Sequence, residues 1–145
     1  MLIDILIDNK NSWIWHYKDK LRSLNAFGEL RFYSSSEYLD KGDVLLLLSC
    51  NKILPLELLS LHKYNIVIHE SDLPKGRGWS PVSYQVEKGI MDIPVTLFEA
   101  NQELDTGKWY IKSTIKLNGT ELIDEIREKQ FNVTLSMIKK FLTGS

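Results

Sequence analysis

The chain has 145 residues, a net charge of −1 and 26% charged residues. The length is enough for one domain with a sizeable hydrophobic core. A near-neutral charge gives no general attraction to nucleic acid or to an acidic membrane face, so neither partner is expected. Cys50 is the single cysteine, which excludes an intramolecular disulfide and fits a reducing compartment. The first residues place acids inside a short apolar run, which is typical of a strand and not of a signal peptide. We therefore expect one cytoplasmic, soluble domain over residues 1–145.

Apolar strand patterns alternate with helical patterns along the chain. The predicted strands are 2–7, 29–33, 43–49, 65–69, 94–99 and 108–115. The predicted helical segments are 12–24, a short turn near 38–39, one starting at Pro55, 80–88, and a long terminal helix after the capping pair Asn118 and Glu121. This alternation favours an α/β fold with a parallel-rich sheet flanked by helices. The residues after the first strand lack a Gly-x-Gly-x-x-Gly turn, so neither a dinucleotide site nor a P-loop is expected.

His69 closes one of these strands and precedes a loop dense in Gly, Pro, Ser and charge. Open α/β sheets bind their ligands at the carboxyl ends of the strands. A second strand leads into Leu104-Asp105-Thr106-Gly107, which supplies a carboxylate. A His and an Asp brought together are the parts of an acid/base site. From the residues alone, His69 could also be a structural histidine and Asp105 a turn residue.

The loop His69-Glu70-Ser71-Asp72-Leu73-Pro74 resembles the His-Pro-Ser-Leu-Leu-Pro loop of the formyltransferases that use 10-formyltetrahydrofolate. That family includes the glycinamide ribonucleotide, methionyl-tRNA and sugar N-formyltransferases. Gly78 matches a later family glycine, 104–107 resembles its Leu-Asp-x-Gly signature, and 52–55 is similar to the segment lining the folate pocket. The resemblance spans about 44–115. It implies a Rossmann-like three-layer α/β/α sandwich with a mostly parallel sheet, the formyltransferase catalytic core, with 10-formyltetrahydrofolate as co-substrate. No His, Cys or carboxylate spacing in the sequence suggests a metal site, so no metal is expected.

The resemblance also assigns catalytic roles. His69 would take or relay the amine proton, and Asp105 would orient the imidazole. The family's catalytic asparagine stands two residues before the histidine, where this chain has Val67. Asn65 lies roughly 13 Å from His69 along four residues of extended chain. Asn51 follows the neighbouring strand and should emerge at the same sheet edge, so we expect it to be the oxyanion donor; it could equally be a helix N-cap.

The surrounding residues follow from the same resemblance. Cofactor binding is assigned to Leu48, Ile53, Leu54, Ala100 and Leu104. Acceptor binding is assigned to Ser71, Lys75, Arg77 and Trp79, with the two cations suited to an anionic acceptor. The sequence of residues 70–76 resembles that of compact formyltransferases of bacterial surface-sugar pathways, such as those for pseudaminic and other nonulosonic acids.

The implied function is transfer of a formyl group from 10-formyltetrahydrofolate to an amino sugar or nucleotide-linked amino sugar in surface-glycan biosynthesis. One alternative is a formyl-folate hydrolase. Another is a folate-binding or partner module that has kept the fold and lost activity, which Val67 favours. Small size and exposed aromatic residues favour a homodimer.

Other chemistry-bearing residues carry structural interpretations. His16 and His62 lie in helical patterns with no acidic partner at a telling spacing, so we expect them to be surface or packing residues. Cys50 follows a buried strand and is expected to be a small core residue. The stretch 121–129 is expected to be a solvated helix face.

Overall fold

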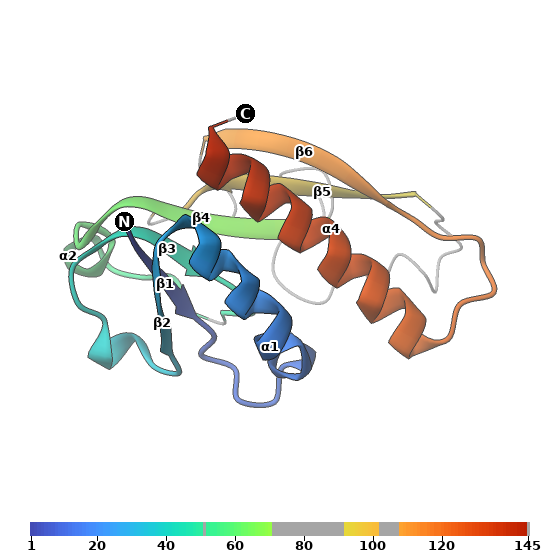
Figure 1. The fold of residues 1–145 in the computed structure, drawn as a ribbon, viewed down its shortest axis with the longest axis horizontal. Coiled ribbons are helices and arrows are strands. Elements are labelled where there is room, and N and C mark those ends of the chain that lie inside the picture. Colours follow the sequence, from blue (N-terminus) through green and yellow to red (C-terminus); the bar gives the residue numbers. More distant parts are fainter. Residues whose placement is uncertain (51, 71–91, 102–107, 145) are drawn as a thin grey trace.

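The computed structural model describes residues 1–50, 52–70, 92–101 and 108–144, in which six strands form one sheet (Figure 1). The strands are β1 (Leu2–Leu6), β2 (Glu29–Tyr33), β3 (Gly42–Leu47), β4 (His62–Glu70), β5 (Asp92–Glu99) and β6 (Trp109–Lys116). Their order across the sheet is β2-β1-β3-β4-β5-β6. All six predicted strands are present, with ends that differ from the prediction by up to three residues.

Five strands run in one direction, and β5 alone runs in the opposite direction. The pairings β1–β2, β1–β3 and β3–β4 are parallel, whereas β4–β5 and β5–β6 are antiparallel. The prediction of an α/β fold with a mostly parallel sheet is confirmed. The reversal places Val95 beside Glu70 and Glu99 beside Ile66, so β5 starts at the carboxyl end of β4 and runs back along β4.

The predicted helix 12–24 is a series of shorter pieces. They are η1 (Trp13–Tyr17), α1 (Lys18–Leu21) and η2 (Arg22–Phe27), where η denotes a 3₁₀-helix. The Ser12 hydroxyl accepts a hydrogen bond from the Ile14 N–H at 3.2 Å and so caps the start of η1. Most side chains of η1 are aromatic or β-branched, and such side chains lose rotamer freedom in a regular α-helix.

The remaining helices are η3 (Ser36–Tyr38), α2 (Leu56–Leu59) and α4 (Ile123–Thr143). The predicted helix 80–88 lies outside the described residues. Asn118 and Glu121 form a turn before α4, in which the Asn118 N–H donates to Glu121 at 2.8 Å. The helix itself begins at Ile123, where the Glu125 carboxylate accepts from the Leu122 N–H at 2.9 Å. The predicted start at Asn118 is therefore wrong by about one turn.

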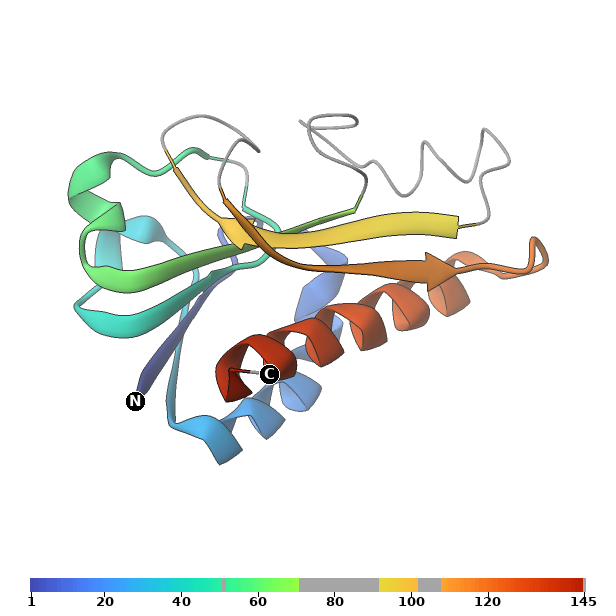
Figure 2. The ribbon, with the colours of Figure 1, turned by 90° about the horizontal axis from the view of Figure 1, so that it is seen from above.

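The sheet lies between two layers of helix. α4 and the segment 13–27 cover one face, and α2 lies on the other (Figure 2). Because successive strand residues point to opposite faces, the strands β1 to β4 contribute to two cores. The larger core joins Ile3, Ile5, Val44, Leu46 and Ile66 to Phe131, Met137 and Ile138 of α4, all buried. The smaller joins Leu6, Leu45 and Leu47 to Leu54 and Leu59.

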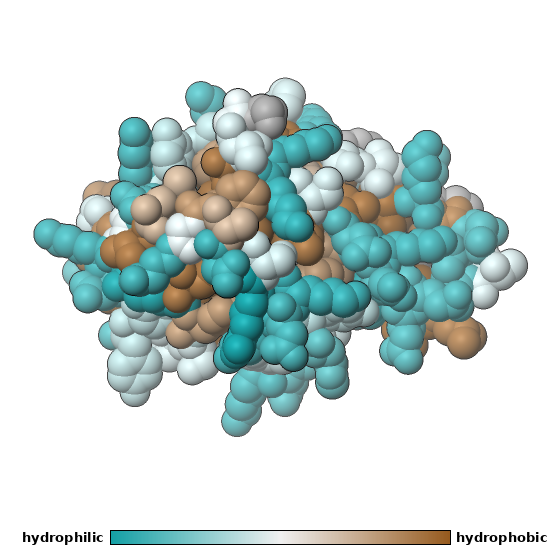
Figure 3. All heavy atoms as spheres, in the orientation of Figure 1, coloured by the Kyte–Doolittle hydropathy of each residue, from teal (hydrophilic) through white to brown (hydrophobic). Residues whose placement is uncertain are grey.

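The outer surface over α4 is mostly hydrophilic. Figure 3 shows polar side chains over most of this face and a hydrophobic group over the amino end of α4. Leu122 and Ile123 are 72% and 57% exposed at that end. None of the helices that the structure describes is both long and apolar enough to span a membrane.

Candidate functional site

His69 lies at the carboxyl end of β4, as predicted. It is the last residue but one of the strand, and its cross-strand neighbour in β5 is Thr96. Val67 belongs to the smaller core, on the face opposite α4, and the period-two alternation of the strand puts His69 on that same face. The Nε2 atom of His69 is inaccessible to solvent. An imidazole is thus held at the sheet edge where α/β folds bind their ligands.

Thr96 adds a buried hydroxyl next to His69. The residue is 1% exposed, and its Oγ1 atom has no hydrogen-bond partner in the described part of the chain. A buried hydroxyl without a partner costs free energy, so such a group is a natural contact for a bound molecule. Sequence reasoning missed Thr96, although its place opposite His69 follows from the pairing of β4 with β5.

β3 directs the chain toward His69. The parallel register ends with Leu47 beside Val67, two residues before the histidine. Ser49 then adopts a left-handed backbone with φ 54°, and its Oγ accepts from the Ser12 hydroxyl at 2.7 Å. Asn51 comes two residues after Ser49 but lies outside the described residues, so its role stays a prediction.

Asn65 has a structural role in this fold. It is 5% exposed, and its side-chain amide donates to the Leu59 carbonyl at 2.7 Å, joining β4 to the end of α2. Which residue replaces the family asparagine missing at Val67 stays a prediction.

The loop after β5, which contains the predicted Asp105, starts at a different level of the sheet from the loop after His69. The Ala100 N–H donates to the Asn65 carbonyl at 2.7 Å, so the chain leaves β5 level with Asn65 and not with His69. Glu99 secures this point, because its carboxylate accepts from the Asn65 N–H at 2.7 Å and from the Tyr110 hydroxyl at 3.0 Å. Burial, with the Glu99 hydrogen bond, raises the pKa of Tyr110 to about 12. Leu104 and Asp105 lie outside the described residues, and their meeting with His69 stays a prediction.

The predicted pocket residues divide into two sets. Leu48 and Leu54 are 3% and 4% exposed and pack in the larger and smaller core, respectively. Ile53 is 50% exposed and Ala100 is half-buried. The four predicted acceptor-binding residues, Ser71, Lys75, Arg77 and Trp79, lie outside the described residues. Ile53 is the member of the described set that offers a large open apolar surface.

Cys50 is poorly suited to be a nucleophile. Its thiol donates to the Leu6 carbonyl at 3.3 Å, and burial raises the pKa of Cys50 to about 12. The thiol therefore stays protonated near neutral pH, and the interpretation as a packing residue stands. The described residues contain no group of three His, Cys, Asp or Glu side chains that could hold a metal.

A second polar cluster is buried near the amino ends of β3 and β4. Asp4 is fully buried, and the Arg31 guanidinium donates to both of its oxygens, at 2.7 and 2.8 Å. The His62 Nε2 atom lies 2.6 Å from the second oxygen. His62 is thus the first residue of β4 and has an acidic partner. The prediction of a helical position without one is wrong, because Asp4 is 58 positions away in sequence.

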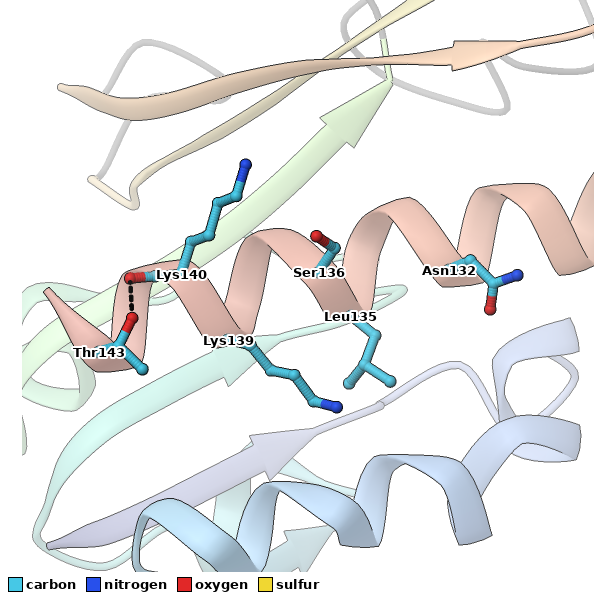
Figure 4. A pocket seen from close by; sticks show the side chains of 6 residues that line it. All are labelled: Asn132, Leu135, Ser136, Lys139, Lys140 and Thr143. Carbon is cyan, nitrogen blue, oxygen red and sulfur yellow. Dashed lines mark hydrogen bonds between the residues drawn. The ribbon is translucent and has the colours of Figure 1, made fainter. Parts of the chain in front are cut away.

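A hollow of about 370 Å³ lies along α4 (Figure 4). Its lining residues all come from that helix: Asn132, Leu135, Ser136, Lys139, Lys140 and Thr143. Leu135 and Lys139 point toward the helical segment 13–27, and Lys140 points away from it. The hollow contains none of the predicted site residues.

Comparison with known proteins supports one family. Residues 34–139, more than half of the chain, match the family described as "Formyl transferase". A methionyl-tRNA formyltransferase from Thermotoga neapolitana is 34% identical over 101 residues, which cover 69% of this chain and 32% of the relative. The chain spans about a third of the length of the curated relatives that it matches.

Solved structures share the fold. A methionyl-tRNA formyltransferase from Clostridium thermocellum aligns with a TM-score of 0.77 at 24% identity, over 99% of this chain and 65% of that one. A sugar N-formyltransferase from a Shewanella species aligns with a TM-score of 0.67 at 16% identity, over 99% of this chain and 70% of that one. These identities speak for the fold alone. Together with the match over 34–139, they identify the chain as a member of the formyl transferase family.

Proposed function

We propose that this chain transfers a formyl group from 10-formyltetrahydrofolate, the donor that the family uses, to an amine, with His69 as acid/base. The observation that supports this most is the position of His69. It is the last residue but one of β4 in a formyl transferase fold, on the face opposite α4 and beside the buried hydroxyl of Thr96. The imidazole is the side chain whose ordinary pKa suits proton transfer near neutral pH.

The donor supplies a formyl carbonyl, whose oxygen gains negative charge as the amine attacks. His69 takes the proton that the attacking nitrogen loses. As the tetrahedral intermediate collapses, the bond between the formyl carbon and the donor nitrogen breaks, and His69 returns the proton to that nitrogen, so tetrahydrofolate leaves. Asn51 donates a hydrogen bond to the oxygen that becomes negative, and Asp105 orients the imidazole. Ile53, half exposed, and the buried Leu54 beside it in sequence fit an apolar wall for the flat head of the donor. The unpaired Thr96 hydroxyl is a polar contact for a bound molecule at the same edge.

For the acceptor we propose an amino sugar or nucleotide-linked amino sugar of bacterial surface glycans. The sequence of the loop 70–76 supports this choice. The cations Lys75 and Arg77 also support it, because they suit a carboxylate or phosphate on the acceptor. Methionyl-tRNA is the second candidate, because proteins with that activity are the sequence relatives described above. The net charge of −1 favours the small acceptor over the nucleic acid.

Two alternatives lack transfer to an amine, and Val67 favours the first of them. A valine in place of the family asparagine removes one candidate oxyanion donor, and the loss of such a donor typically costs on the order of 100-fold or more in rate. The chain would then be a folate-binding or partner module. If water replaced the amine, it would be a hydrolase of the same donor.

The test is formyl transfer from 10-formyltetrahydrofolate to a panel of nucleotide-linked amino sugars and to methionyl-tRNA. We expect His69→Ala to lower the rate by about 100-fold or more, the usual contribution of a positioned acid/base. His16→Ala is the matched control, since His16 is exposed on η1, and it should keep the parent rate. Transfer by His69→Ala at the parent rate would refute the role of His69.

The same assay separates the alternatives. Loss of the formyl group without any formylated acceptor identifies a hydrolase. Saturable binding of the donor without turnover identifies a binding module.

A further inference from the structure

β4 extends past its neighbour β3, so among the described residues the last three of β4 have a strand partner on one side. The β3 register ends at Val67, whereas Ile68, His69 and Glu70 pair with Leu97, Thr96 and Val95 of β5 in the part of the chain that the structure describes. A strand end held by a single ladder opens more readily than one held by two. A contact that holds this strand end therefore bears on the direction of the His69 side chain.

Glu70, the residue after His69, is tied to α4. The Gln130 side-chain amide donates a short hydrogen bond to the Glu70 carboxylate. Gln130 is 4% exposed, and its side-chain oxygen in turn accepts from Arg127 Nη1 at 2.9 Å. The Arg127 guanidinium lies over the ring of Trp13, 5.1 Å from its centre. A continuous chain of contacts thus runs from η1 through α4 to the end of β4.

The charges of the contacting side chains Arg127, Gln130 and Glu70 are balanced. Gln130 accepts from the cation and donates to the carboxylate, which an amide side chain does without leaving either end unpaired. Burial lowers the pKa of Arg127, and the charge of Glu70 acts against that effect. Hydrogen bonds to ionised groups are the stronger kind, so the tether is well suited to hold a strand end.

The alternation of the strand transmits the tether to His69. Side chains of successive strand residues point to opposite faces, so fixing Glu70 on the face of α4 fixes His69 on the other. The loop that this chain resembles carries proline at the position of Glu70. Proline restrains the backbone through its fixed φ, whereas Glu70 does so through a side-chain contact.

We propose that Arg127, Gln130 and Glu70 form a positioning relay that holds the end of β4 and directs the His69 imidazole toward the face opposite α4. The three are positioning residues and act through His69. The inference rests on the proposed function, in which His69 moves the proton of the amine.

The first variant is Gln130→Leu, which keeps the side-chain volume close to that of the parent and removes both the donor and the acceptor. Amide hydrogen exchange at His69 and Glu70 should speed up by about 10-fold, and the imidazole resonance of His69 should move. That resonance is identified among the three histidines by its loss in His69→Ala. The kcat of formyl transfer should fall by about 10-fold or more, because a misplacement of about 1 Å can cost about 100-fold. The KM for the donor should change less than about 2-fold, because the relay does not contact the donor in this proposal.

Thr134→Val is the matched control, because Thr134 is equally buried on the same helix, at 4% exposed, and lies outside the relay. It should leave the exchange at His69 and Glu70 and the kcat at parent values. The double variant Glu70→Gln with Gln130→Glu tests rescue. The new amide at position 70 donates to the new carboxylate at position 130, which also accepts from Arg127. This variant should recover kcat and exchange to within about 3-fold of the parent, by the same donor and acceptor pairing.

The relay is refuted if Gln130→Leu leaves both exchange and kcat unchanged while His69→Ala abolishes transfer; the proposed function then stands. It is also refuted if Thr134→Val lowers kcat as much, or if the double variant rescues nothing, since the effect is then general loss of stability. Parent-rate transfer by His69→Ala removes the proposed function and the relay together.

Discussion

Asp4 is a carboxylate without exposed surface, and its neighbours account for its burial. The Arg31 guanidinium donates to both oxygens, and this pairing holds the pKa of Arg31 above its ordinary value. His62 contacts the same carboxylate at 2.6 Å. Gly42 leaves the necessary space, since a Cβ there would lie 2.6 Å from an Asp4 oxygen. A buried charge is tolerated when it is paired in this way, and removal of one partner is costly.

Asp4→Asn should therefore destabilise the protein strongly. We expect the free energy of unfolding to fall by about 3 kcal/mol, the usual cost of breaking a buried ion pair. Urea unfolding followed by tryptophan fluorescence measures it. Asp19→Asn is the control, because the side chain of Asp19 is 96% exposed and its pair with Arg22 is 3.9 Å apart. That variant should cost less than about 1 kcal/mol. Equal losses in both would show that Asp4 is not a special position.

Local pattern predicted His69 but not the partners of polar groups. His69 was identified because an apolar run precedes it and a Gly- and Pro-rich loop follows. The contact of His62 with Asp4 and that of Glu70 with Gln130 join residues 58 and 60 positions apart, which no local pattern reports. Likewise, 121–129 was expected to be a solvated face, yet Arg127 is partly buried between Trp13 and Gln130.

The positions of the strands were predictable from the sequence, whereas the direction of β5 was not. Period-two alternation and uninterrupted apolar runs located all six, because each strand packs against at least one core. The antiparallel direction of β5 was not predicted, since the same pattern describes a strand in either direction. That direction decides where the loop after Glu99 starts, level with Asn65. The predicted meeting of Asp105 with His69 thus depends on a path that strand patterns do not describe.

The turn before α4 makes this helix sensitive to acid. Lys129, followed by backbone N–H groups of the turn, lowers the pKa of Glu121 to about 2 from an ordinary 4.5. The unfolded chain therefore binds a proton at Glu121 at higher pH than the folded one does, and the stabilisation is lost as the pH falls from about 4.5 toward 2. We expect Glu121→Gln to lower the free energy of unfolding above pH 5, with the difference from the parent shrinking toward zero near pH 2.

Thermal unfolding of both proteins between pH 7 and pH 3 checks this. Glu57→Gln is the control, because Glu57 is exposed on α2 and forms no ion pair in the described part of the chain. A difference between Glu121→Gln and the parent that stays constant over this range would contradict the account.

α4 joins the two ends of the fold. Its Phe131 is fully buried and stacks on Tyr17 of η1, with ring centres 4.5 Å apart. Near its end, Phe141 contacts Tyr64 of β4 and Tyr110 of β6. One helix thus bridges the amino-terminal segment and the antiparallel half of the sheet, and the two halves share the larger core.

Phe131→Ala should weaken the whole molecule and not α4 alone. The lost contacts and the cavity are expected to lower the free energy of unfolding by about 3–5 kcal/mol. Urea unfolding read by circular dichroism and by tryptophan fluorescence should shift by the same amount, as one cooperative unit requires. Ile123→Ala on the same helix is the control, since Ile123 is 57% exposed and should cost about 0.5 kcal/mol or less. Separate transitions for the two signals would mean that the halves unfold independently.

The fold class was predictable because it depends on the order and periodicity of apolar segments. The loop motifs added the family, which the match over 34–139 supports. The acceptor has no such signature, since it depends on how a few polar side chains meet in space.

One of the two outermost strands of the described sheet carries charges that oppose pairing with another sheet. β6 forms one edge of the described sheet, and it carries the exposed cations Lys112 and Lys116. Lys112 also covers the ring of the exposed Trp109, at 4.8 Å. A second sheet approaching this border would bring like charges together, and lysines on edge strands oppose open-ended aggregation in this way. At high concentration, the same lysines therefore favour a dispersed protein over fibrils.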